Sequence, residues 1–190
     1  MSFDKVTGSS MAPTLNARTH ETGWRDRLLI HTTAWVKEDV KRGDIITFWK
    51  PHKAEEISIK RVVAIGGDTV FPNRGFFVDR GFMGLKKLGL MDGLGRKEEE
   101  EGWVKEGKEV GVLVPHGHIW VEGDNWRETL DSCEFGPISL ALVEGRASRV
   151  WSWSRLGFHK IGDQRLSKDS RKGASRVVEG RSRVPDEFVE

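Results

Sequence analysis

Two adjacent serines, Ser9 and Ser10, lie near the start of the chain in a segment that Gly8 and Pro13 predict to be a turn. A serine hydroxyl is a poor nucleophile unless a base lies within hydrogen-bond distance. Without such a base, the segment is simply typical of a structural turn. The chain has no G-x-S-x-G motif, so a base must be found elsewhere in the sequence before serine catalysis is a reasonable interpretation.

Histidine is the usual base beside a catalytic serine, but no histidine of this chain stands in a pattern typical of a Ser-His-Asp triad. Imidazoles at the surface or at the ends of strands explain them equally well. The six are His20, His31, His52, His116, His118 and His159.

Lys60 is the better candidate for the base, because it lies in the most apolar strand that the sequence predicts, residues 57–65. Side chains alternate along a strand, so Lys60 shares a face with Ser58, Val62 and Ala64. Burial lowers the pKa of an ammonium group, and Lys60 can then act as a neutral general base. The alternative is a lysine that extends its ammonium group to water.

A third segment, residues 123–137, is dense in small polar side chains and follows a predicted strand over residues 118–122. A loop closed by Asx turns would explain Asp124, Asn125 and Asp131 without any catalysis. The order of the serine turn, the lysine strand and this loop is what favours a catalytic interpretation.

The elements that must position these residues are predicted to be mainly β, forming an antiparallel sheet with a barrel-like core. Apolar residues alternate or form short β-branched runs between turn residues, and a long apolar pattern with a period of 3.6 residues is hard to find. The predicted strands cover residues 28–36, 44–49, 57–65, 111–114, 118–122 and 141–151.

The length of 190 residues is enough for one domain. We predict a catalytic domain over residues 1–159. It includes a solvated insert at about residues 73–110, which is rich in Gly and carries a run of charges. Residues 160–190 are mostly polar or charged, which predicts a disordered tail.

Composition excludes several classes of protein. The 31 Lys and Arg against 29 Asp and Glu leave a net charge of +2, too small to indicate a nucleic-acid partner. The single cysteine, Cys133, cannot form an internal disulfide, and no Cys and His cluster offers a zinc site. No apolar run approaches the about 20 residues that span a bilayer as a helix, and residues 1–10 carry no recognisable targeting signal.

Four segments resemble, in order and with compatible spacing, the sequence boxes of the type I signal peptidases, which are membrane proteases with a Ser/Lys dyad. The segments are GSSMAPTL, GDIITFWKP, IKRVVAIGGD and GHIWVEGDNWRETLDSCEFGP. The resemblance covers about residues 6–151. Three shorter stretches, WRDR, PTLN and FGPI, are most similar to the subunit 2 type of the mitochondrial inner membrane peptidases.

The resemblance implies that Ser10 is the nucleophile and that Lys60 is its general base. The endoplasmic reticulum relatives use histidine in place of this lysine, so Lys60 indicates the bacterial and mitochondrial branch. Thr129 stands where the family has a serine that orients the lysine ammonium. Gly8 stands where some relatives have a serine of the oxyanion hole, which leaves the Ser10 N–H as the surest donor to the oxyanion.

Asp131 and Ser132 match the Asp-Ser pair of the family and are expected to orient the site. Bacterial members often place an arginine after this pair, where this chain has Cys133, so Asp131 is expected to have another partner. The family's preference for small residues before the cleaved bond implies shallow apolar subsites. We expect Met11, Ala12 and the strand of Lys60 to line these subsites.

The function implied by the resemblance is a serine endopeptidase that needs no metal or other cofactor. Its expected partners are precursor proteins bearing sorting signals for the mitochondrial intermembrane space, the membrane, and a sibling protease subunit in a heterodimer. The expected location is the intermembrane-space face of the mitochondrial inner membrane. The family is anchored by a helix before the serine box, and only nine residues precede Ser10. The anchor is therefore expected in a missing start, and the alternative is that a membrane-bound partner localises the protein.

Two other functions remain open from the sequence. The chain can be a non-catalytic partner subunit of a signal peptidase complex, although the intact pair of Ser10 and Lys60 argues against this. It can also be a self-cleaving protease of the Ser/Lys repressor type, on a related β core. That type needs a DNA-binding domain and a cleavage site within the chain, and neither is recognisable.

Overall fold

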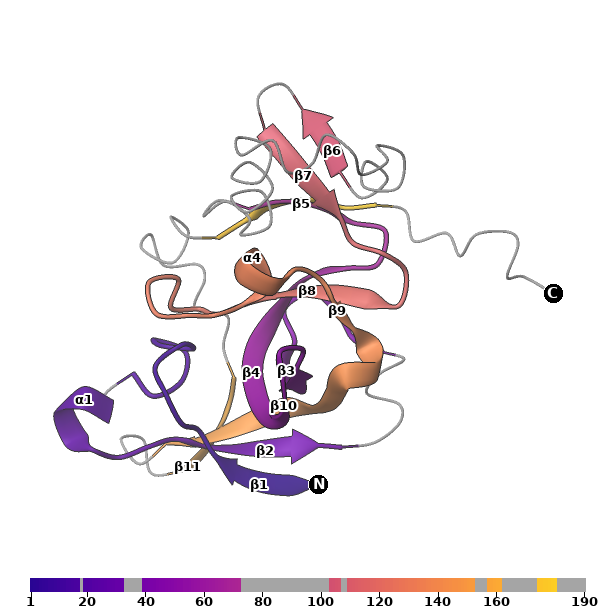
Figure 1. Ribbon diagram of the computed structural model, residues 1–190. Helices are drawn as coiled ribbons and strands as arrows, with labels where there is room; N and C mark the ends of the chain where they lie inside the picture. Colours follow the sequence, from indigo (N-terminus) through magenta and orange to yellow (C-terminus); the bar gives the residue numbers. More distant parts are fainter. Residues whose placement is uncertain are drawn as a thin grey trace.

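The structure is a computed structural model that describes residues 1–17, 19–32, 39–72, 103–106, 109–152, 157–161 and 174–180. These residues form two antiparallel β-sheets with very little helix (Figure 1). The predicted fold class, a mainly β protein built on antiparallel strands, is confirmed.

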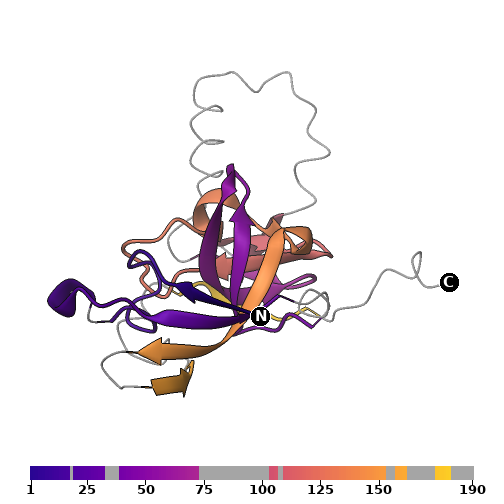
Figure 2. The ribbon, with the colours of Figure 1, turned by 90° about the horizontal axis from the view of Figure 1, so that it is seen from below.

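The larger sheet has eight strands in the order β1-β2-β10-β3-β4-β8-β9, with β11 paired to β10. Figure 2 shows this sheet from below, with the long strands β4 and β10 crossing its centre. The strands are β1 (Ser2–Lys5), β2 (Arg27–His31), β3 (Ile45–Lys50), β4 (Lys53–Ile65), β8 (His118–Glu122), β9 (Ile138–Ser139), β10 (Val143–Ser152) and β11 (Gly157–Lys160).

The smaller sheet has the order β12-β5-β7-β6 and lies beyond β8, on the side away from the other long strands of the larger sheet (Figure 1). Its strands are β5 (Thr69–Phe71), β6 (Trp103–Glu106), β7 (Glu109–Leu113) and β12 (Arg176–Val178). The helical elements are α1 (Thr19–Thr22), α4 (Ser132–Phe135) and the 3-10 turn η1 (Leu140–Leu142). Within the described part of the chain, every helix is too short to cross a membrane.

Burial follows the alternation of side chains along the strands. In β2, Leu28 and Ile30 point into the core while their neighbours are more exposed. These two residues pack with Met11 and Leu15 from the turn after β1, in one of three apolar clusters. The turn that carries the serines is therefore fixed to the first sheet by buried apolar side chains on its C-terminal side.

The structure differs from the sequence-based expectation in the predicted insert and tail. Most of the insert lies outside the described residues, but β6 and β7 form a hairpin on the second sheet at its end. Within the predicted disordered tail, β12 pairs with β5, and Val177 packs against a buried cluster. Two apolar residues are too few to reveal a strand by periodicity, and its partner is distant in the sequence. Residues 162–173 and 181–190 of the tail lie outside the described residues.

Candidate active site

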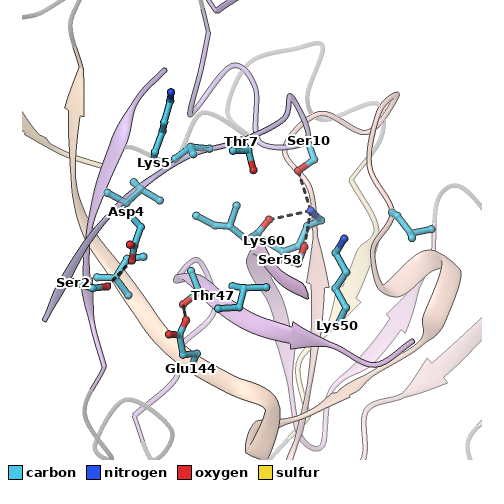
Figure 3. Close-up of a pocket in the computed structure, with 16 residues that line it drawn as sticks. Ser2, Asp4, Lys5, Thr7, Ser10, Thr47, Lys50, Ser58, Lys60 and Glu144 are labelled. Carbon is cyan, nitrogen blue, oxygen red and sulfur yellow. Dashed lines mark hydrogen bonds between the residues drawn. The ribbon is translucent and has the colours of Figure 1, made fainter. Parts of the chain in front are cut away.

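Lys60 of β4 and Ser10 of the turn after β1 meet at the wall of a cavity (Figure 3). The Lys60 Nζ donates a hydrogen bond of 2.9 Å to the Ser10 Oγ. It also donates to the backbone oxygen of Ile59 at 3.0 Å and to the Ser58 Oγ at 3.3 Å. Three acceptors around one nitrogen fix the lysine side chain in direct contact with the serine hydroxyl.

The environment of Lys60 favours the neutral amine. The side chain is buried, with 4% of the residue exposed. The pKa of Lys60 is lowered from 10.5 to about 8, mainly by desolvation and in part by the nearby positive charge of Lys50. The carboxylates of Asp131 and Asp124 act in the opposite direction but do not cancel the effect of burial. A sizeable fraction of Lys60 is therefore neutral at mildly alkaline pH and can accept a proton.

The charge of Lys50 gives a testable shift in the pH dependence. Lys50 lines the same cavity and lowers the pKa of Lys60. We expect Lys50→Met to move the acidic limb of the profile of kcat/KM against pH to higher pH, because the neutral form of Lys60 then appears later. Lys53→Met is the matched control, since Lys53 binds the same Glu56 carboxylate but does not line the cavity. Equal midpoints in the two variants would contradict this role of Lys50.

The backbone around Ser10 is held by the loop after β8. The Asn125 N–H donates to the Ser10 carbonyl oxygen at 3.0 Å, and the Asn125 side-chain amide donates to the Ser9 carbonyl oxygen at 3.2 Å. The Ser9 hydroxyl points to a different partner, Glu128, at 2.5 Å. Among the described residues, no group accepts a hydrogen bond from the Ser10 N–H. This N–H is therefore available to an oxyanion.

A buried ion pair connects the strand of Lys60 with both loops of the site. Arg61 donates to both carboxylate oxygens of Asp124, at 2.8 and 2.6 Å, and the two side chains are 3% and 1% exposed. Asp124 also accepts from the Thr14 hydroxyl at 2.5 Å. Breaking such a pair by removing one partner typically costs about 3–5 kcal/mol. Because neighbouring side chains of a strand point to opposite faces, Arg61 fixes β4 while Lys60 faces the cavity.

Gly123 lies at a position where there is no room for a side chain. A Cβ atom at this position would lie 2.6 Å from the Ser10 carbonyl oxygen and closer still to the Thr129 hydroxyl oxygen. The absence of a side chain at Gly123 thus lets the serine turn and the loop after β8 approach each other closely.

We expect Gly123→Ala to lower kcat at least about tenfold, because the added methyl group must push the Ser10 turn away from Lys60. Overpacking of this kind also lowers the free energy of unfolding by about 1–3 kcal/mol. Gly157→Ala is the control, since no atom lies within 4 Å of its added Cβ. Steady-state kinetics and thermal unfolding of the two variants test this expectation, and two variants that both behave like the wild type would contradict it.

The structure gives Asp131 and Ser132 partners in the backbone. Asp131 is fully buried and accepts from the N–H groups of Gly123 and Cys133 and from the Thr129 hydroxyl, at 2.9, 3.1 and 3.1 Å. The Ser132 hydroxyl oxygen accepts from the Val121 N–H at 2.9 Å. Both residues hold α4 and its preceding loop against β8, and the Asp131 carboxylate also raises the pKa of Lys60.

Thr129 and Gly8, which the family resemblance assigns to the site, do not contact the Lys60 nitrogen in the described structure. The Thr129 hydroxyl donates to Asp131, whereas the described acceptors of the Lys60 ammonium are Ser10, Ser58 and the Ile59 carbonyl. Gly8 has a φ of 84°, a left-handed conformation that favours glycine, and no atom lies within 4 Å of an added Cβ. Gly8 therefore shapes the turn that presents Ser10.

The cavity beside the dyad has a volume of about 660 Å³ and is bounded by β1, β2, β3 and β4 (Figure 3). Met11 and Ala12 do not line it, and Met11 is 2% exposed within the apolar cluster below the turn. The apolar part of the lining comes from other residues. These are Val6, Leu28, Ile30, Ile57, Ile59 and Leu130.

Two residues of the site did not stand out from the sequence. Ser58 binds the Lys60 ammonium, and its position two residues earlier on the same face of the strand is the signal that could have indicated it. Gly123 was recognised only as part of a motif. Its close approach to Ser10 depends on contacts between residues far apart in the sequence, which no local pattern reveals.

Comparison with known proteins places the sequence of this chain in a family. Residues 2–153 match the family model described as signal peptidase, peptidase S26. A zebrafish (Danio rerio) protein named mitochondrial inner membrane protease subunit 2 is 34% identical over 152 residues, which are 80% of this chain and 64% of that protein. The mouse (Mus musculus) protein of the same name is 32% identical over 80% of this chain and 70% of its own length.

A Schizosaccharomyces pombe protein named mitochondrial inner membrane protease subunit 1 is 26% identical, over 77% of this chain and 71% of that protein. The chain thus spans about two thirds of the length of these relatives. The resemblance that the four sequence boxes indicated is confirmed, because the family model covers most of the chain. This protein belongs to the signal peptidase family, peptidase S26.

Proposed function

We propose that this protein is a serine endopeptidase in which Ser10 is the nucleophile and Lys60 the general base. The observation that carries the proposal is the hydrogen bond of 2.9 Å between a buried lysine nitrogen and a serine hydroxyl at the wall of a cavity. Membership of the signal peptidase family supports the same chemistry.

The three partners of the Lys60 nitrogen explain how it can take a proton from Ser10. A neutral amine has two N–H bonds and one lone pair. The N–H bonds point to the Ile59 carbonyl and the Ser58 hydroxyl, and the lone pair faces the Ser10 hydroxyl. In this state Ser10 donates its hydrogen bond to Lys60, the reverse of the charged form. As Ser10 attacks a carbonyl carbon, its proton passes to Lys60.

The remaining steps follow from the same groups. The Ser10 N–H stabilises the oxyanion that forms on the attacked carbonyl, and one such donor contributes about 3 kcal/mol in the transition state. The Lys60 ammonium then protonates the leaving amine, and the C–N bond breaks to leave an ester on Ser10. A water molecule gives one proton to Lys60 and attacks the ester carbonyl. Lys60 returns this proton to the Ser10 oxygen as the bond between the acyl carbon and that oxygen breaks. The carboxylic acid product is released and ionises in water, and the free enzyme is restored.

The cavity fits a peptide in an extended conformation that adds its backbone to a strand edge. The apolar lining includes Ile57, Ile59 and Leu130, and Lys60 and Ser10 line the same pocket. Shallow apolar walls accept small side chains and exclude large ones. We therefore assign the subsites beside the cleaved bond to these residues rather than to Met11 and Ala12.

The proposed substrates are precursor proteins whose sorting signals are removed on delivery to the mitochondrial intermembrane space. Several relatives are named as subunits of a mitochondrial inner membrane protease, with subunits 1 and 2 among them. By analogy, this protein acts at the inner membrane, on the intermembrane-space face, in a heterodimer with a sibling protease subunit.

A precursor with a sorting signal tests the proposal. The purified protein, with and without its sibling subunit, is incubated in detergent micelles with the precursor, and the product is sequenced from its new N-terminus. We expect one cut after a small residue, and no cut in a matched precursor that carries Trp at that position. An uncut precursor in the presence of both subunits, or equal cleavage of the Trp precursor, would contradict the proposed specificity.

A further inference from the structure

A short segment near the C-terminus, residues 174–180, lies beyond residue 153, where the match to the family ends. We call this segment the C-terminal clip. It contains β12, which pairs with β5 at the edge of the second sheet (Figure 1). Because it is held by contacts along its whole length, its role can be derived from those contacts.

The C-terminal end of the clip is fixed by the buried carboxylate of Asp68. Asp68 is 0% exposed and accepts from the Gly180 N–H at 2.9 Å, from the Ile65 N–H at 2.9 Å and from the Arg42 guanidinium at 2.6 and 2.7 Å. A Cβ atom on Gly180 would overlap the carbonyl oxygen of Gly67. The clip can thus dock only with glycine at position 180.

In the middle of the clip, Val177 points inward and Val178 points outward. Val177 contacts a buried cluster that includes Val63 and Ala64 of β4, the strand of Lys60. The guanidinium of Arg176 lies 3.9 Å from the centre of the Phe71 ring. Val178 points outward and is 46% exposed. Val177 and Val178 therefore provide a matched pair for mutation.

The N-terminal end of the clip contacts Glu122, the last residue of β8. The Ser175 N–H donates to one carboxylate oxygen of Glu122 at 3.4 Å, and the Trp120 indole donates to the other at 2.8 Å. Glu122 is 6% exposed. The next residue is Gly123, against which the Ser10 carbonyl and Thr129 pack too closely for any side chain.

We propose that the C-terminal clip is a positioning element of the active site. It holds Glu122, and thereby the end of β8 and Gly123, at the place that sets the Ser10 turn against Lys60. It also covers the cluster behind β4. None of its residues touches the cavity, so its effect on catalysis passes through Glu122 and Gly123. The inference rests on the proposed function, because it assigns a positioning role to the same dyad.

Point variants of the full chain test this role. Gly180→Ala and Val177→Asp release the clip, whereas Val178→Asp is the control on its exposed side. We expect hydrogen exchange at residues 69–71 to become faster in the first two variants only. At a temperature well below unfolding, we expect kcat of these two variants to fall about tenfold while KM stays within about twofold. Val177→Ala gives a milder, intermediate loss and serves if Val177→Asp does not fold.

Three results would overturn the proposal. Unchanged exchange at residues 69–71 would mean that the clip is not docked. Faster exchange with unchanged kcat would mean that the clip only stabilises the fold. An equal loss of kcat in Val178→Asp would mean that the effect is not specific to docking. The proposed function is judged separately in the same assay, because it requires wild-type cleavage and its loss in Ser10→Ala.

Discussion

Replacing Ser10 with alanine is expected to abolish peptide cleavage, with kcat reduced by roughly 10⁵-fold to 10⁶-fold. The hydroxyl supplies the atom that forms the covalent intermediate in the proposed mechanism. The adjacent Ser9 hydroxyl is bound to Glu128, and the Lys60 nitrogen contacts Ser10. The measurement is the rate of cleavage of a sorting-signal peptide by each purified variant.

Ser9→Ala is the matched control for this prediction. It removes a hydroxyl one residue away and only an exposed hydrogen bond to Glu128, so its kcat is expected to stay within about threefold of the wild type. If Ser9→Ala lost cleavage while Ser10→Ala retained it, the assignment of the nucleophile would be wrong. If Ser10→Ala processed precursors normally without any other active copy, the protein would be a non-catalytic partner subunit.

Replacing Lys60 with methionine is expected to have the second largest effect, a loss of kcat of about 10⁴-fold or more. Methionine is similar in length and apolar, so it fills the buried site but cannot accept the Ser10 proton. In the wild type, activity should rise with pH to a plateau above about 8, the lowered pKa of Lys60. Steady-state kinetics between pH 6 and pH 10 provide the measurement, and retained cleavage by Lys60→Met would exclude Lys60 as the base.

Lys60→Met should also have a higher free energy of unfolding than the wild type at pH 7. A lysine whose pKa falls on folding from 10.5 to about 8 destabilises the folded state below pH 8. This shift corresponds to about 3 kcal/mol at pH 7, and the cost disappears as the pH rises from about 8 to 10.5. Urea unfolding at pH 7 should therefore show a higher free energy of unfolding for Lys60→Met. A large loss of stability would mean that the lost activity reflects misfolding.

The sequence predicted those parts of the molecule that depend on local pattern. Alternation along the strand placed Lys60 on a face with apolar side chains, and the structure buries it there with a lowered pKa. For most of the predicted strands, the ends in the structure differ by a few residues from the predicted ends. Whether the last residues of a strand pair depends on their neighbours. The core strand over His118–Glu122 matched the expected range.

Features that depend on contacts between residues far apart in the sequence were harder to predict. Met11 directly follows Ser10, yet its side chain turns into the core, where it belongs to the same apolar cluster as Leu28 and Leu15. Thr129 matched a family position, but its hydroxyl binds Asp131, and Ser58 contacts the lysine instead. In each case adjacency in the sequence did not reveal the direction of the side chain, which is decided by tertiary packing.

The most direct test of the Ser10 and Lys60 mechanism is to trap the acyl-enzyme. The protein is mixed with a slowly hydrolysed ester substrate and quenched in acid, and the added acyl group is located by mass spectrometry of peptides. We predict one acyl group on Ser10 in the wild type and in Ser9→Ala, and none in Ser10→Ala or Lys60→Met. An acyl group on Ser9, or continued cleavage without any acylation of Ser10, would contradict the mechanism.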